Sequence, residues 1–195
     1  MVAGMLAGCQ RPEPQRARKL RVLADSLVGA QHQLENPTEE EAAEAFAWAD
    51  AQYREFNLLL DDGTITISKE EGGIISEVSR ARRLLKDQAK RRTALPKGAS
   101  RAQSQLHALA DAIASGAAKD AAGNTIDDAY IDREIQTESR IARDLIAAMT
   151  ETQSLALRGI ALKESIEIRS DSLQTVCRAR LARAILEGTV NAPVE

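Results

Sequence analysis

Aromatic residues are scarce in this chain of 195 residues, where they make up only 3% of the sequence. Glycine and proline are also few, at 11 and 5 residues, whereas alanine occurs 34 times. Helices favour alanine, leucine, arginine, glutamate and glutamine, and strands favour aromatic and β-branched residues. The composition therefore predicts an all-α protein. It argues against a β-sandwich, a β-barrel and an aromatic platform for single-stranded nucleic acid.

Cysteines and long apolar runs are lacking as well. The two cysteines, Cys9 and Cys177, are too few for a small scaffold held together by disulfides. No apolar run in the sequence reaches the roughly 18 residues that a membrane span needs. Cys177 falls on an expected amphipathic helix, where a buried free thiol that packs as a small apolar group is the common role.

Signatures of metal binding and catalysis are missing too. A di-iron centre in a helical bundle uses Glu-x-x-His motifs, but Gly29 and Ser104 stand three residues before His32 and His107. We find no cysteine pair with zinc-ligand spacing, no calcium loop with its full ligand set and no glycine-rich phosphate loop. We therefore expect no metal, no cofactor and no catalytic residue, and a protein that is not an enzyme.

The N-terminus carries the most specific motif. Residues 1–8 are small and apolar, and they end in Leu6-Ala7-Gly8 directly before Cys9. This order of a leucine, two small residues and a cysteine resembles the lipobox of bacterial lipoprotein precursors. In that motif the residues before the cysteine are small because they must fit the narrow site of a signal peptidase. The resemblance covers about nine residues and names no family for the body of the chain.

The resemblance implies a membrane anchor. In bacterial lipoproteins the cysteine receives a diacylglyceryl group and becomes the new N-terminus, and two or three acyl chains make a stable anchor. Residues 1–8 would then be a truncated or incomplete signal-peptide-like segment, and residues 9–15 a lipid-anchored tether. The resemblance implies a location in the bacterial cell envelope. In lipoproteins an Asp directly after the cysteine commonly retains the protein at the inner membrane, but Gln10 stands there in this chain, so the outer membrane is implied where the host has two membranes.

The rest of the sequence shows helical periodicity. Apolar residues recur at spacings of three and four over residues 15–34, and Asn36-Pro37 ends this segment. Thr38, with Glu41 three residues later, predicts a capping box for a helix that reaches residue 60. Further helices are expected over residues 69–93, 102–115 and 125–186.

These segments predict an antiparallel bundle of about four to six helices. Pro96 and Gly98 are expected to separate the third helix from the fourth, and Thr125 to cap the fifth. The last segment is expected to form one long C-terminal helix or to break near residues 170–172. We expect a single helical-bundle domain over residues 16–187 and a loose tail over residues 188–195.

Charge is segregated along the chain, although the net charge is only −3. From Glu35 to Glu77 there are 12 acidic residues, and from Arg80 to Arg101 there are nine basic ones. The basic segment either binds a polyanion or neutralises the acidic helix before it, as flanking charges do in coiled coils. The candidate interaction patch consists of five basic residues and one aromatic residue that lies off the apolar seam of its helix: Arg82, Arg83, Lys86, Lys90, Arg91 and Trp48.

These observations favour a non-catalytic protein of the bacterial envelope that is anchored at Cys9 and serves as an interaction, scaffold or ligand-binding module. One alternative is a cytoplasmic helical protein that binds nucleic acid or another polyanion through residues 80–101, although the charge balance makes nucleic acid an unfavoured partner. A second alternative is a periplasmic sensor with a small-ligand pocket between helices. The expected partners are the membrane, an unidentified protein and a second copy of the chain.

Overall fold

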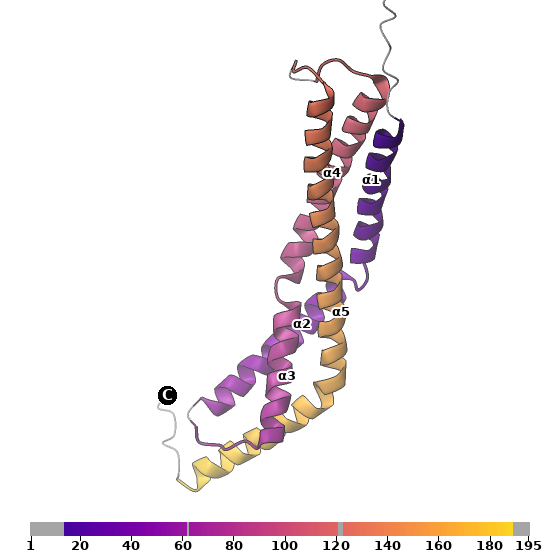
Figure 1. Cartoon of the computed structure of the whole chain (residues 1–195). Helices are drawn as coiled ribbons and strands as arrows, with labels where there is room; N and C mark the ends of the chain where they lie inside the picture. The colour runs from indigo at the N-terminus through magenta and orange to yellow at the C-terminus, as the bar shows by residue number, and fades with distance from the viewer. Residues whose placement is uncertain (1–13, 62, 121–122, 189–195) are drawn as a thin grey trace, which may run out of the picture. The chain divides into compact units, whose positions relative to one another are not determined.

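The computed structural model describes residues 14–61, 63–120 and 123–188. These ranges form five helices and no strand: α1 (Pro14–Leu34), α2 (Glu39–Leu60), α3 (Lys69–Leu85), α4 (Gln88–Ser115) and α5 (Asp128–Leu186). Figure 1 shows that α5 continues without a break to the C-terminal end of the described chain. The predictions of an all-α helical bundle and of one long C-terminal helix are confirmed.

Two capping boxes fix where α2 and α3 begin. Thr38 Oγ1 accepts a hydrogen bond from the amide of Glu41, and the Glu41 carboxylate accepts one from the amide of Thr38. Ser68 and Glu71 repeat the arrangement at the start of α3. Each box satisfies two amides that a helix start would leave unpaired. The sequence prediction of the first box is confirmed.

The break between the third and fourth helices is not where the sequence placed it. Lys86 is extended and Asp87 adopts a positive φ of 64°, which ends α3, whereas α4 runs through both Pro96 and Gly98. An Asp tolerates the left-handed conformation better than most residues. A Cβ at Gly98 would lie 3.1 Å from Leu145 Cδ2, so this glycine serves close packing against α5 rather than a break.

The described chain groups into two compact units. Unit 1 contains α1 up to Gln33, α4 from Ala94 and α5 up to Thr150. Unit 2 contains residues 34–93 and α5 from Glu151. The single domain expected over residues 16–187 stays a prediction.

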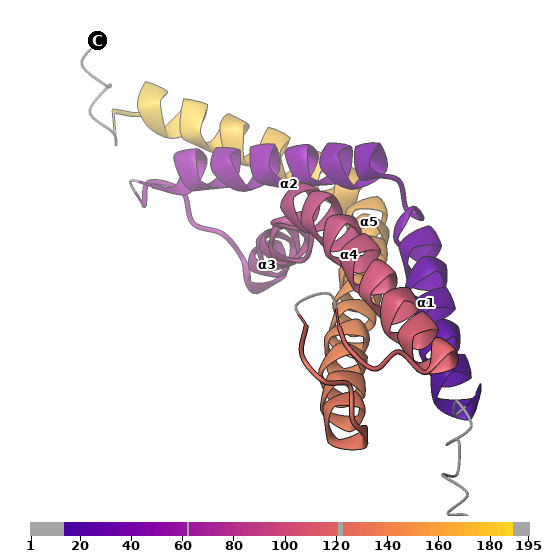
Figure 2. The same ribbon diagram turned by 90° about the horizontal axis from the view of Figure 1, so that it is seen from above.

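Unit 1 is a three-helix bundle in which α1 and α4 run antiparallel (Figures 1 and 2). Arg21, early in α1, pairs with Asp111, late in α4, at 2.8 Å, and Gln31 near the end of α1 donates to the Pro96 carbonyl at 3.1 Å. The core is built from small and medium apolar side chains: Ala17, Leu20, Ala24, Leu27, Ala30, Ala99, Ala102, Leu106, Ala110, Ile113, Ala142 and Met149.

Unit 2 packs the α2–α3 hairpin against the second part of α5 (Figure 1). Phe56 and Val78 are fully buried there with Ile166 and Cys177 of α5. Burial raises the pKa of the Cys177 thiol, as expected for a cysteine that packs rather than reacts. The expected role of Cys177 as a core residue is confirmed.

Candidate functional site

Arg82, which the sequence analysis assigned to the exposed patch, lies in the α2–α3 interface. Its Nε donates to Asp50 Oδ1 at 2.6 Å, and its guanidinium carbon lies 4.8 Å from the centroid of the Tyr53 ring. The Asp50 carboxylate also accepts from Arg54, and these contacts lower its pKa, with the Arg82 hydrogen bond as the main cause. Arg82 is therefore engaged inside unit 2.

The other four basic residues of the candidate patch lie at the end of α3 and the start of α4. Arg83, Lys86 and Lys90 are exposed, and Arg91 is half-buried. None of the four forms an ion pair with a residue that the structure describes. Their role as a surface for a polyanion stays a prediction, and the structure adds that their charge is not neutralised by α2.

Three acidic residues of α2 and α3, Glu55, Glu71 and Glu77, pair instead with arginines of α5. Glu55 binds Arg178, and Glu77 binds Arg169 at 3.2 Å. Of the arginines in the basic segment, Arg82 is the one that forms an ion pair with a described acidic residue of α2. Among the described residues, the interpretation that the two oppositely charged segments neutralise each other holds for the ion pair of Arg82 with Asp50, and Glu39 and Glu41 of α2 also attract the charge of Arg92.

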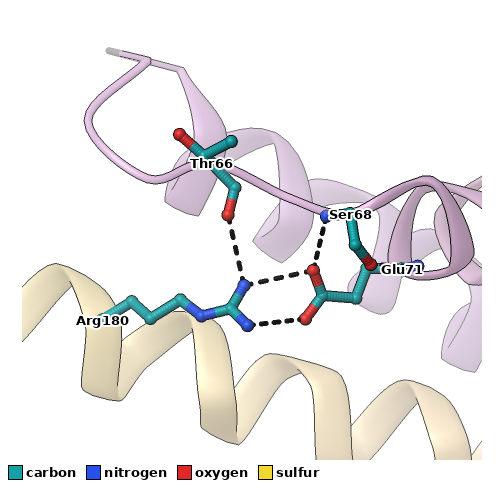
Figure 3. Close-up of polar contacts among 4 residues, drawn as sticks. All are labelled: Thr66, Ser68, Glu71 and Arg180. Atoms are coloured by element: carbon teal, nitrogen blue, oxygen red, sulfur yellow. Dashed lines mark hydrogen bonds and ion pairs between the residues drawn. The ribbon is translucent and has the colours of Figure 1, made fainter.

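Figure 3 shows the most elaborate of these pairs, which ties the start of α3 to α5. Arg180 Nη2 donates to Glu71 Oε1 at 2.8 Å, while Nη1 donates to Glu71 Oε2 and to the Thr66 carbonyl, each at 3.2 Å. Glu71 also closes the capping box with Ser68. The Arg180 hydrogen bonds, helped by Ser68, lower the pKa of Glu71 to about 2, so the pair stays charged well into the acid range.

Trp48 lies on α2, half-buried against the core of unit 2. Lys163 of α5 places its Nζ 6.0 Å from the centroid of the indole ring. In the described chain no hydrogen bond, ion pair or ring contact joins Trp48 to the basic residues of the candidate patch. The structure therefore does not gather the predicted patch into one site.

Cys9 lies outside the described residues, so the lipid-anchor prediction is untested. Across residues 14–61, 63–120 and 123–188, no helix is both long enough and apolar enough to cross a membrane. In the same ranges no three His, Cys, Asp or Glu side chains are grouped so that they could hold a metal ion.

A concave site is present in unit 1, between the end of α4 and the start of α5. This α4–α5 hollow has a volume of about 580 Å³. It combines apolar walls with several polar groups, as ligand sites commonly do. Its lining residues are Gln105, Ala108, Leu109, Ala112, Ile113, Lys119, Asp120, Ile126, Tyr130, Ile131, Glu134 and Glu138.

The loop between α4 and α5 contributes Lys119, Asp120 and Ile126 to the lining of the hollow. Asp120 organises this loop, because its carboxylate accepts from the amide and the side chain of Asn124 at 2.8 Å and from the Tyr130 hydroxyl at 3.2 Å. Asp127 caps α5 by accepting from the Tyr130 amide at 2.7 Å, so the expected cap at Thr125 is wrong by two residues. The hollow is therefore bounded by a hydrogen-bonded loop.

Two carboxylates one helical turn apart, Glu134 and Glu138, project from α5 into the lining of the hollow. Glu138 Oε2 is buried and has no hydrogen-bond partner in the described chain. Burial raises the pKa of Glu138, and the neighbouring Glu134 carboxylate raises it further. A buried carboxylate oxygen without a donor is costly unless a proton or a bound group supplies one.

Comparisons with protein-family models, with curated proteins and with solved structures find no match for this chain. The sequence analysis offered a pocket between helices only as an alternative and named none of its residues. The one available signal was the Glu134–Glu138 spacing, which also occurs on ordinary solvated helix faces.

Proposed function

We propose that the protein is a non-catalytic ligand-binding module of the bacterial envelope, and that it binds a small molecule in the α4–α5 hollow. The observation that carries the proposal is the combination, in one concave site, of apolar walls and the unpartnered carboxylate oxygen of Glu138. Apolar walls provide affinity, and a few placed polar groups provide specificity.

Binding in the hollow is tested with an uncharged fluorophore, N-phenyl-1-naphthylamine, whose emission rises in apolar surroundings. We expect saturable binding to the full chain. Ala108→Trp should weaken binding at least about tenfold, because an indole on this lining residue fills the hollow. Ala114→Trp is the matched control, since Ala114 is exposed on the same helix and does not line the hollow. Equal binding by the Ala108 variant and the wild type would refute the proposal.

The proposed location rests on the lipobox-like residues before Cys9, and it has its own test. When the gene is expressed in bacteria with its native upstream region and radiolabelled palmitate is supplied, we expect the protein to be labelled. Cys9→Ala should abolish the label, because the thiol is the acceptor of the lipid. An unlabelled wild-type protein would overturn the anchor and favour the cytoplasmic, polyanion-binding alternative.

A further inference from the structure

The charged groups around the α4–α5 hollow are unbalanced in favour of negative charge. The loop contributes Lys119 and Asp120, α5 contributes Glu134 and Glu138, and α4 contributes only the neutral amide of Gln105. Three carboxylates thus face one ammonium group in this lining. A concave site with this balance attracts cations and repels anions.

The three carboxylates differ in how far their hydrogen-bonding capacity is used. Asp120 is occupied by Asn124 and Tyr130, as described above. Glu134 lies 3.8 Å from Arg133 Nε, in a long pair whose arginine is 66% exposed, and such surface pairs contribute little. Glu138 has a buried oxygen without a donor among the residues that the structure describes. Glu138 is therefore the group that gains most from a bound donor.

A cationic donor suits Glu138 better than a neutral one. Glu134 lies one helical turn away, so a positive charge between the two side chains is attracted by both carboxylates. Hydrogen bonds between an ammonium or guanidinium group and a carboxylate are also roughly twice as strong as neutral ones. The other face of the hollow, formed by Leu109, Ile113 and Ile131, calls for an apolar body on the same ligand.

We infer that the α4–α5 hollow binds a small organic cation, in which an ammonium or guanidinium group contacts Glu138 and Glu134 and an apolar body packs against the wall formed by α4. This inference rests on the proposed function and adds the class of ligand. A compact ligand fits better than a docked helix, because Lys119, Asp120 and Ile126 of the connecting loop line the hollow together with α4 and α5. The volume of about 580 Å³ also falls within the usual range for small-molecule sites.

The inference is tested with two probes of nearly equal shape, 4-phenylbutylamine and 4-phenylbutan-1-ol, each titrated against the fluorophore complex of the full chain. At pH 8 we expect the amine to bind at least about tenfold more tightly than the alcohol. Glu138→Gln should reduce this preference at least about threefold, and Glu134 accounts for the preference that remains. Asp25→Asn is the matched control and should retain the full preference, because Asp25 is an exposed carboxylate of unit 1 that does not line the hollow.

Acidification provides an independent readout. The preference for the amine should fall as the pH drops through the raised pKa of Glu138, because the carboxylate becomes neutral while the amine keeps its charge. Equal affinities for amine and alcohol in a wild type that still binds the fluorophore would overturn the inference and leave the proposed function standing. A preference that Glu138→Gln leaves undiminished would also overturn it. Failure of every probe to bind would overturn the proposed function itself.

Discussion

Arg92→Met is expected to lower the free energy of unfolding of unit 2 by about 3 kcal/mol, because two buried carbonyls lose their donor. Arg92 is only 8% exposed, and its Nη1 donates to the carbonyls of Leu34 and Pro37, the latter at 2.7 Å. Burial lowers the pKa of Arg92, because a charged group is costly to remove from water. Removing this charge therefore offsets part of the stability that is lost with the hydrogen bonds. Methionine keeps most of the apolar stem of arginine, which confines the effect to the lost hydrogen bonds.

The measurement is urea unfolding followed by the fluorescence of Trp48. This residue is the only tryptophan of the chain and packs against the core of unit 2, so its emission reports that unit. Lys90→Met is the matched control, since Lys90 is an exposed cation of the same helix, and it should change the stability by less than about 0.5 kcal/mol. A stability of Arg92→Met equal to that of the control would show that the two carbonyls do not depend on Arg92.

Arg92 also shows what can and cannot be learned from the sequence. The helical character of its segment follows from composition and apolar spacing, and the start of α2 follows from Thr38, because a capping box is a local signal. Whether an arginine in a basic segment faces solvent or two carbonyls more than fifty positions away is decided by tertiary packing. In the sequence, Arg92 is therefore only one of nine basic residues between Arg80 and Arg101.

The misplaced break between α3 and α4 has a similar cause. Proline and glycine are the residues that usually end helices, yet Pro96 and Gly98 lie inside α4. The actual break at Asp87 lets Gln88 turn inward, where its Nε2 donates to the Thr152 carbonyl at 3.2 Å. Propensity is a weak guide where such a contact competes with it. The α4–α5 hollow was hidden for the same reason, since its lining depends on how α4 is placed against α5.

Gly159→Ala is expected to destabilise unit 2 by about 2 kcal/mol, although the same change usually stabilises a helix by about 1 kcal/mol. A Cβ at this position would lie 2.5 Å from Leu85 Cγ and 2.8 Å from Leu85 Cδ2. Leu85 is 1% exposed, and Cγ is the branch point of its side chain, so it cannot move aside without shifting the packed core of α3. Overpacking therefore outweighs the gain in helix propensity.

A double-mutant cycle isolates this contact, again with the fluorescence of Trp48 as the probe. Leu85→Ala alone creates a cavity and destabilises unit 2, but in that background Gly159→Ala should become neutral or stabilising, because the clash is gone. Gly73→Ala is the matched control, since nothing lies within 4 Å of a Cβ at Gly73 in α3, and it should stabilise the unit. If Gly159→Ala stabilised the wild type as much as Gly73→Ala does, α3 and α5 would not pack as closely as the described contact requires.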